Sequence, residues 1–304
     1  MDVAVHIEAL TKRFGAVSAV DNFSLDVPTG DVFAFLGSNG SGKTTTFRCL
    51  LGIYTADAGV AHIQGKLYTS AQSGRVGYLP EERGIYTRST VRDVLHYFAA
   101  LHGIAAPIRT KRIDRYLERV GLTQNAEQKI NQLSSGMQQK VQIGAAIIHE
   151  PSVLILDEPF KGLDPLNRQL FLDIFEEQRD KGATILYSTH VVDEVQRLAN
   201  RVVMIKDGKR VLYGTIDEVR EQYGSHTITI SFSGSLPDNT ALYIARREHN
   251  FAELQLRGNT DSQEVLRYLA NQPNLMIREY RFDRPTLNTI FIEHAKTPEK
   301  DHAA

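Results

Sequence analysis

The stretch Gly37-Ser38-Asn39-Gly40-Ser41-Gly42-Lys43-Thr44 decides the fold, because it fits the phosphate-binding pattern G-x-x-x-x-G-K-[ST]. An apolar run at 32–36 precedes it and a helix-compatible segment at 45–51 follows it, so the loop joins a strand to a helix. The alternative is a Gly/Ser linker that happens to contain a lysine, but a linker does not explain the flanking strand and helix. The stretch therefore predicts a nucleoside triphosphate site in an α/β fold.

Each part of this loop has a physical role in holding phosphate. Glycines let backbone N–H groups turn inward where a side chain would block the approach. The helix that follows adds unpaired N–H groups and the positive end of its dipole. Lys43 is expected to place a point charge on the β- and γ-phosphates, and Thr44 to offer its hydroxyl to Mg²⁺. The predicted nucleotide-binding residues of the loop are Gly37, Ser38, Asn39, Gly40, Ser41, Gly42, Lys43, Thr44 and Thr45.

Composition narrows the class of protein. The 304 residues suffice for one large or two modest domains, and a formal charge of -1 gives no reason to expect nucleic acid as a partner. A single cysteine, Cys49, argues against a disulfide framework or a zinc cluster and fits a reducing cytosol. The first residues lack a basic n-region, so we expect no signal peptide. No run approaches 18 apolar residues, so we expect no membrane span.

The N-terminal third reads mainly as strands. Val3, Val5 and Ile7 alternate with polar residues, which is typical of a half-buried strand, and a second strand is expected over 19–27. Between them lies Phe14 beside Gly15. An aromatic residue there belongs to the core in most proteins, but upstream of a phosphate loop it is also a candidate platform for stacking on a base.

The middle of the chain predicts a helical insertion between two halves of a sheet. The character is helical from Thr90, a candidate cap, to about 149. Buried strands follow at 153–156 and 183–188, with a helix over 167–181 between them. The segments 201–206 and 209–213 flank Asp207-Gly208, which predicts a hairpin.

In the C-terminal part, a new alternation of apolar and polar residues begins. From about residue 225 an alternating strand is followed by further short strands and two helical pieces, near 262–270 and 285–294. We expect a separate small α+β accessory domain at 225–296 and a disordered tail at 297–304. The nucleotide-binding domain is expected to span 1–224, with its helical subdomain at about 88–150.

Two buried strands end in residues suited to catalysis. Parallel strands bind ligands at their carboxyl ends, so Asp157 is placed to hold Mg²⁺ opposite Thr44. Glu158 is placed to act as the general base on the attacking water. His190 follows the neighbouring strand and could orient the γ-phosphate, although a lone histidine at a strand end is more often structural.

The segment 133–140 contains a polar helix start. Ser134 and Ser135 precede a predicted helix, and the simplest interpretation is a plain N-cap. A Ser-Gly helix start is also an anion site in its own right.

Taken together, these segments resemble the ATP-binding subunit of an ABC transporter. The resemblance covers residues 3–220 and follows the order of the family's motifs: the aromatic Phe14, the Walker A loop 37–44, the Q-loop at 78–81, the signature 133–137, the Walker B segment ending Asp157-Glu158, the D-loop 162–165, and His190. The region after 225 is similar to the extra C-terminal domain of many exporter-type subunits. The implied fold is a P-loop NTPase core with an antiparallel β subdomain and a helical insertion.

The resemblance also implies how the chain works. Each ATP would lie between one subunit's Walker A loop and the partner's signature helix, whose Ser134 and Gly136 meet the γ-phosphate. The implied partners are a second copy or a related ATPase subunit, and an integral-membrane permease that holds the chain at the cytoplasmic face of the membrane. Three departures stand out: Phe14 replaces the commoner Tyr, Met137 stands where Gln is usual, and Glu81 takes the Gln position of the Q-loop, where its carboxylate can still meet Mg²⁺.

Two other functions stay open on sequence alone. A soluble relative acting on nucleic acid or ribosomes would usually carry two ATPase units, a long coiled-coil insertion or a basic charge, and none is visible here. A non-hydrolytic nucleotide sensor would not need Glu158, Lys43 and His190 together. We therefore expect an ATP- and Mg²⁺-dependent hydrolase that drives a transporter, and the resemblance of the C-terminal region implies an exporter.

Overall fold

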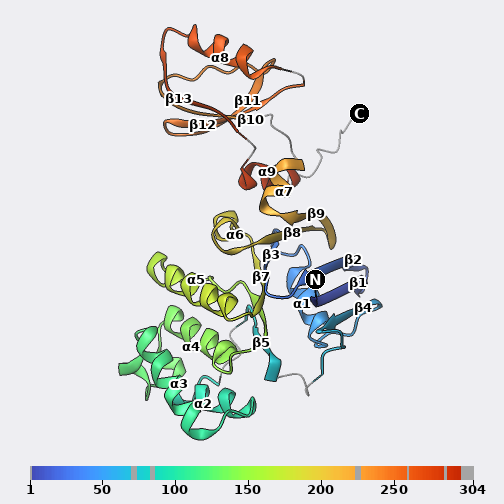
Figure 1. Ribbon diagram of the computed structural model, residues 1–304, viewed down its shortest axis with the longest axis vertical. Helices are drawn as coiled ribbons and strands as arrows, with labels where there is room; N and C mark the ends of the chain where they lie inside the picture. Colours follow the sequence, from blue (N-terminus) through green and yellow to red (C-terminus); the bar gives the residue numbers. More distant parts are fainter. Residues whose placement is uncertain are drawn as a thin grey trace. The chain divides into compact units, whose positions relative to one another are not determined.

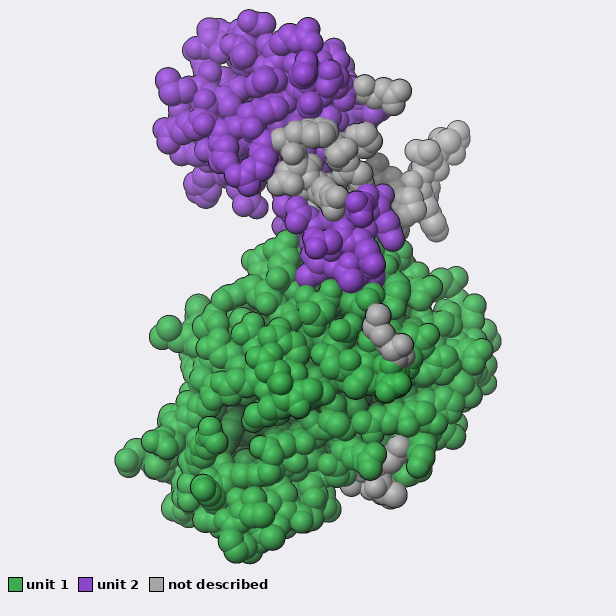
Figure 2. All heavy atoms as spheres, in the orientation of Figure 1, with its two compact units in different colours: residues 1–213 green, residues 214–304 purple. Residues whose placement is uncertain are grey.

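The computed structural model describes residues 2–69, 74–82, 86–222, 227–258, 260–283 and 286–295. The chain divides into two compact units, residues 1–213 and residues 214–304 (Figure 2). The expected C-terminal tail, 297–304, lies outside the described residues.

The first unit is built on a six-stranded sheet of order β5-β6-β7-β3-β8-β9. Strands β5 to β8 pair in parallel along this order, which is the arrangement that puts ligands at one edge. The central strands are buried along their whole length, as their continuous apolar runs predict. The strands are β3 (Val32–Leu36), β5 (Val76–Leu79), β6 (Val153–Asp157), β7 (Thr184–Thr189), β8 (Arg201–Lys206) and β9 (Lys209–Thr215).

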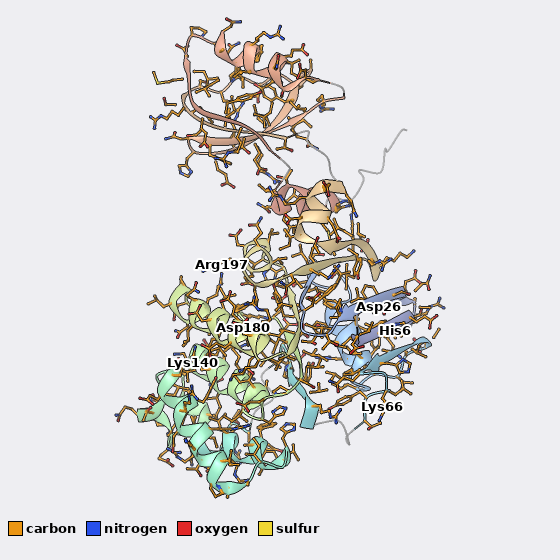
Figure 3. The ribbon with its side chains drawn as sticks, in the orientation of Figure 1. His6, Asp26, Lys66, Lys140, Asp180 and Arg197 are labelled. Carbon is orange, nitrogen blue, oxygen red and sulfur yellow. The ribbon has the colours of Figure 1, made fainter. Side chains whose placement is uncertain are left out.

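An antiparallel sheet of order β2-β1-β4 packs with the first sheet around one hydrophobic core. Its strands are β1 (Val3–Phe14), β2 (Val17–Pro28) and β4 (Ala58–Ile63), and the core also includes helix α1 (Lys43–Leu50). Figure 1 shows this antiparallel sheet on one side of the parallel sheet and helices α2 to α5 on the other. On the outer surface of the antiparallel sheet, His6 and Asp26 form an ion pair at 2.6 Å (Figure 3).

The expected helical insertion is confirmed as three helices, α2 (Val91–Leu101), α3 (Ala106–Arg119) and α4 (Ser135–Ile147), rather than one continuous stretch. Thr90 caps α2 as expected, because its side chain accepts a hydrogen bond from the Asp93 N–H. Lys140 of α4, labelled in Figure 3, donates to the carbonyl of Val120 at 2.8 Å and so ties α4 to the end of α3.

Helix α5 (Pro165–Asp180) begins two residues before the expected start, because Asp164 caps it and Pro165 occupies its first turn. The hairpin of β8 and β9 is confirmed, and both turn residues adopt positive φ, 50° at Asp207 and 75° at Gly208. Helix α6 (Val192–Leu198) was not predicted, since seven residues give too short a periodic signal.

The interpretation of residues 12–14 as a connection between strands is wrong. They belong to β1 and pair with the start of β2, so that Phe14 faces Val17 across the turn at Gly15. Bulges along the register of β1 interrupt the regular alternation, which is why the sequence pattern fades after Ile7.

The second unit contains an antiparallel sheet of order β11-β12-β10-β13 with its own hydrophobic core. Helix α8 begins and ends as predicted, and Val265 and Leu269 bury its apolar face. Helix α7 was not predicted. The elements are α7 (Ile216–Gln222), β10 (Thr227–Gly234), β11 (Tyr243–Glu248), β12 (Phe251–Leu256), α8 (Ser262–Ala270), β13 (Leu275–Asp283) and α9 (Leu287–Ala295).

Candidate nucleotide site

The phosphate loop lies between β3 and α1, at the carboxyl edge of the parallel sheet. A pocket of about 260 Å³ opens there, lined by Asn39, Gly40, Ser41, Gly42, Lys43, Thr44, Thr45, Glu81 and Glu158. Gly42 has φ 111°, and a Cβ at this position would lie 2.4 Å from the carbonyl oxygen of Ala19. Only glycine therefore fits the close approach of the loop to β2.

The lysine of the loop is buried and aimed back along it. Lys43 Nζ donates to the carbonyls of Gly37 at 2.7 Å and Ser38 at 3.1 Å, and it lies 3.9 Å from Glu158 Oε1. Burial lowers the pKa of Lys43, and the nearby Glu158 carboxylate opposes this shift. The loop thus holds a poorly solvated positive charge at the mouth of the pocket.

Asp157, the last residue of β6, is almost completely buried. Its Oδ1 accepts a hydrogen bond from Ser188 Oγ at 2.5 Å, while its Oδ2 has no hydrogen-bond partner in the described part of the chain. Burial raises the pKa of Asp157, against the lowering effect of the Ser188 and Thr44 hydroxyls. A buried carboxylate oxygen without a partner beside a Thr hydroxyl is suited to a hard cation such as Mg²⁺.

Glu158 and His190 lie together. The His190 Nδ1 is 3.1 Å from Glu158 Oε2, and the Glu158 N–H donates to Ser188 Oγ at 2.9 Å. Glu158 has φ 49°, a left-handed conformation that is rare for a residue with a side chain and recurs at functional sites. The arrangement puts a carboxylate, an imidazole and the Lys43 ammonium around one end of the pocket.

Glu81 lines the same pocket and has a counter-ion that the sequence did not indicate. Lys161 Nζ donates to Glu81 Oε1 at 2.8 Å, although 80 residues separate them in the chain. The side chain of Glu81 is 35% exposed, so this ion pair is partly shielded from water. Nothing in the sequence indicated this pair, because Lys161 lies between the Walker B segment and the D-loop and belongs to neither motif.

Phe14 lies outside the lining of this pocket and is 46% exposed. The ring of Tyr54 meets its ring edge-on, with 5.4 Å between centroids, and the Tyr54 hydroxyl accepts a hydrogen bond from Arg48 Nη1 at 2.8 Å. Lys12 Nζ lies 5.4 Å from the Phe14 centroid. An exposed aromatic face held by a second ring can stack on a planar base. No pattern in the sequence indicated Tyr54 as the neighbour of Phe14.

The predicted signature residues also lie outside the pocket. Ser134 caps α4 as expected, accepting a hydrogen bond from the Met137 N–H at 3.3 Å, and it is exposed. Gly136 has no atom closer than 3.7 Å to the position of an added Cβ. Within one chain, the structure therefore brings the Walker A loop, Glu81, Asp157, Glu158 and His190 together, and leaves Phe14, Ser134 and Gly136 apart from them.

The fold and this site define a P-loop nucleoside triphosphatase. The model of the ABC transporter family matches residues 20–161, and a model described as the C-terminal domain of DrrA1-3-like ATP-binding proteins matches residues 214–295. The chain therefore belongs to the ATP-binding proteins of ABC transporters, which are ATP hydrolases.

Three similar proteins support this assignment. An uncharacterized ABC transporter ATP-binding protein of Bacillus subtilis (strain 168), YhaQ, is 36% identical over 94% of this chain and 97% of its own length. The linearmycin resistance ATP-binding protein LnrL of the same organism is 32% identical over 79% of this chain and 78% of its own length. A solved structure of an ATP-binding subunit of an ABC transporter superposes with a TM-score of 0.69 at 30% identity, covering 73% of this chain and 93% of that one.

Proposed function

We propose that this chain drives export through a separate membrane permease, by closing around two Mg-ATP as a dimer and opening after hydrolysis. The chain belongs to the ATP-binding proteins of ABC transporters, and to this we add the direction of transport, the permease and the dimer. The observation that carries it is the pocket in which Lys43, Glu81 and Glu158 converge. The resistance function in the name of LnrL supports export, because resistance to a compound commonly comes from removing it.

The residues of the pocket fit a magnesium-bound triphosphate. The loop N–H groups and Lys43 would hold the phosphates. Thr44, Asp157 and Glu81 would hold Mg²⁺, with phosphate oxygens completing its shell, since Mg²⁺ in such sites uses one or two carboxylates. The structural observation that fits a cation here is Asp157 Oδ2, which has no hydrogen-bond partner among the described residues. Bound Mg²⁺ supplies neutralisation of the charge on the β- and γ-phosphates.

Within this site we assign roles to four side chains. Glu158 acts as the general base for the attacking water, and His190, hydrogen-bonded to it, positions its carboxylate. Lys161 balances the charge of Glu81. When Mg-ATP is bound, Glu81 would exchange this partner for the cation. The exchange explains how a glutamate can occupy the Q-loop position without repelling the γ-phosphate.

The dimer is supported by the exposed N-terminus of α4, which does not line the nucleotide pocket of its own chain. The N-terminus of α4 is exposed at Ser134, and a Cβ added at Gly136 would meet no atom closer than the Gly162 carbonyl oxygen at 3.7 Å. A helix N-terminus attracts phosphate, so a second copy or a related subunit could complete the site with Ser134 and Gly136 in trans. Phe14 would stack on the adenine.

A groove on the first unit fits the permease. This groove, about 340 Å³ in volume, is lined mainly by apolar side chains: Tyr68, Val76, Tyr78, Leu79, Pro80, Phe98, Leu101, His102, Gln142, Ala145, Ala146 and His149. Both polar atoms of the Gln142 amide are buried without a hydrogen-bond partner in the described residues. Leu79 and Pro80 lead directly to Glu81, so a helical segment of a permease seated here would touch the strand that ends at the nucleotide.

The helices of the described residues include none long and apolar enough to cross a membrane. In this proposal the groove is where the permease holds the chain at the cytoplasmic face. The test is Leu101→Glu, which puts a charge on the groove at a side chain that is 59% exposed, against the control Ile108→Glu, 52% exposed and outside the groove.

The readout is the share of the chain that sediments with membranes from its own source, followed by substrate uptake into inside-out vesicles. We expect Leu101→Glu to release the chain and Ile108→Glu to leave it bound. Retention of both variants, or release of both, would remove the groove from the proposal. If substrate entered only right-side-out vesicles, the direction of transport would be import and not export.

A further inference from the structure

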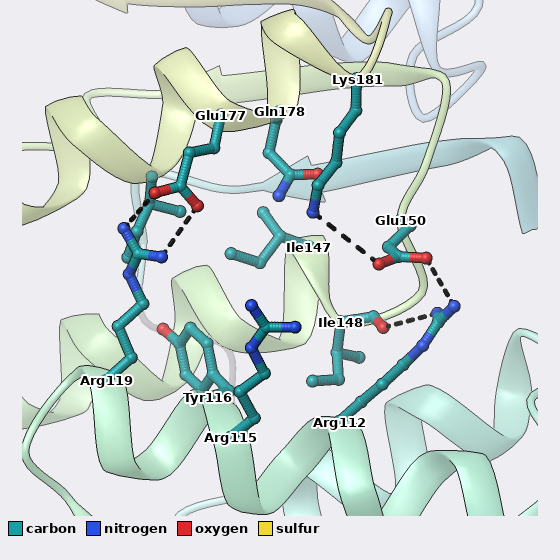
Figure 4. A pocket seen from close by; sticks show the side chains of 11 residues that line it. Arg112, Arg115, Tyr116, Arg119, Ile147, Ile148, Glu150, Glu177, Gln178 and Lys181 are labelled. Carbon is teal, nitrogen blue, oxygen red and sulfur yellow. Dashed lines mark hydrogen bonds and ion pairs between the residues drawn. The ribbon is translucent and has the colours of Figure 1, made fainter.

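A second cavity lies away from the nucleotide site, between α3, the end of α4 and the C-terminal half of α5 (Figure 4). Its volume is about 120 Å³, and it shares no lining residue with the nucleotide pocket. Its walls come from the helical subdomain on one side and from the core on the other, so a molecule bound here would touch both.

The floor of this cavity is apolar. Ile147, Ile148 and Ile174 line it, each less than a tenth exposed, and the ring of Tyr116 forms a wall. The ring is fixed in place because the Tyr116 hydroxyl donates to the carbonyl of Lys140 at 2.5 Å. Such a surface favours the carbon body of a ligand over water.

The rim carries more positive than negative charge. Four cations, Arg112, Arg115, Arg119 and Lys181, face two carboxylates, Glu150 and Glu177. Both carboxylates are already engaged: Arg119 Nη1 lies 2.8 Å from Glu177 Oε2, and Arg112 Nη2 lies 2.5 Å from Glu150 Oε2.

Arg115 is the cation left over. It forms no hydrogen bond or ion pair with any residue that the structure describes, and Figure 4 shows its guanidinium directed into the cavity between Arg112 and Arg119. A guanidinium offers a planar fork of donors that matches a carboxylate with two parallel hydrogen bonds.

Gln178 supplies a second unused polar group. The residue is 8% exposed, and its side-chain amide forms no hydrogen bond with the described residues. Figure 4 shows this amide above the cavity, on the side of α5. An amide without a partner on the protein can donate its N–H to a ligand that accepts a hydrogen bond.

We propose that this cavity binds a small carboxylate with an apolar body, such as a branched-chain or aromatic acid. Its carboxylate would pair with Arg115 and accept a hydrogen bond from Gln178, and its carbon body would lie on Ile147, Ile174 and the ring of Tyr116. The bound acid would join α3 to α5 and so fix the helical subdomain, with Ser134 at the far end of α4, against the core. The site is thus a regulatory one, and it does not depend on the proposed direction of transport.

The binding test uses the full chain without nucleotide. Benzoate and isovalerate are titrated at constant ionic strength, with benzamide as the neutral counterpart of benzoate, and the thermal midpoint is recorded. A ligand that binds the folded chain raises this midpoint with concentration. We expect both acids to raise it and benzamide to have no effect.

Variants locate the effect. Arg115→Ala should weaken binding about tenfold or more, as expected for the loss of a charged hydrogen-bonding partner. Lys111→Ala is the control, since it removes a cation from an exposed position on the same helix that does not line the cavity. Gln178→Leu should weaken binding by a smaller factor.

The functional readout is ATP turnover at saturating ATP. Benzoate should change the turnover of the wild type and of Lys111→Ala, and leave that of Arg115→Ala unchanged. The proposal is overturned if neither acid raises the midpoint, if benzamide acts as benzoate does, or if both variants lose binding alike. Binding without any change in turnover would overturn the regulatory role.

Discussion

The N-termini of helices α1 and α4 can both attract an anion, but in the described part of the chain only the first is surrounded by charged side chains. The N-terminus of α1 has no side-chain cap, and the buried residues Lys43, Asp157 and Glu158 surround it. The N-terminus of α4 is capped by Ser134 and exposed. The first helix start is thus kept unpaired for a ligand inside the chain, whereas the second is satisfied and presented outward. The difference favours a site whose two halves come from two chains.

The largest effect on ATP turnover is expected at Glu158, beside the N-terminus of α1. Glu158→Gln keeps the shape of the side chain and removes the base, so turnover should fall at least about 100-fold. ATP binding should persist, and with ATP the variant should elute as a dimer on sizing. Phosphate release and elution volume measure the two effects. Turnover near the wild-type value would exclude Glu158 as the base.

The next effect concerns the α4 side. Gly136→Ala adds a methyl group where the chain itself leaves room, so the monomer should fold and bind ATP normally. If a partner's nucleotide meets this surface, dimer formation and turnover should fall about tenfold, the scale of a misplaced contact of 1.4 kcal/mol. Gly74→Ala, also in open space, is the control. Unchanged dimerisation in both variants would argue against the two-chain site.

A smaller effect is expected at the ion pair between Glu81 and Lys161. Lys161→Ser should remove the ammonium that competes with Mg²⁺ for Glu81, and so lower the Mg²⁺ concentration needed for nucleotide binding by a few-fold, the coupling typical of a partly exposed pair. Glu81→Gln combined with Lys161→Ser should remove that change, because the charge to be balanced is gone. Equilibrium binding of a fluorescent ATP analogue against Mg²⁺ measures it. Additive effects in the double variant would show that the two residues act independently.

The smallest effect is expected at the aromatic pair. Tyr54→Leu removes the ring edge that holds Phe14, and ATP binding should weaken about two- to fivefold, within the range of a single aromatic contact. Tyr54→Phe keeps the ring and loses only the hydrogen bond from Arg48, so it should bind ATP nearly as the wild type does. Equal losses in both variants would assign the effect to the hydrogen bond instead of the ring.

Much of the fold could be read from local pattern. The buried strands β6 and β7 are continuous apolar runs, the hairpin at Asp207 has its turn residues, and α8 has a regular apolar face with Asp261 as its cap. The irregular β1 and the short helices α6 and α7 were harder, because bulges and brief elements leave little periodicity. The boundary between the two functional domains, expected after residue 224, stays a prediction.

The candidate site divides in the same way. The phosphate loop, Asp157 and Glu158 stand out because strand, loop and acid occur in a fixed order along the chain. Lys161 and Tyr54 do not, since each acts on a residue that only the fold brings near. Their partners, Glu81 and Phe14, lie 80 and 40 positions away in the sequence.

The sequence by itself determined the α/β core, the triphosphate loop and the acids that face it, because these depend on residue type at short, fixed spacing. The tertiary structure alone decided which charges are balanced within the chain and which are not. It paired Glu81 with Lys161, left Asp157 Oδ2 without a partner in the part of the chain that the structure describes, and placed Arg115 and Gln178 at a second cavity. Charge balance depends on distance in space, and side chains far apart along the chain carry no sign of it until the sheet and helices bring them together.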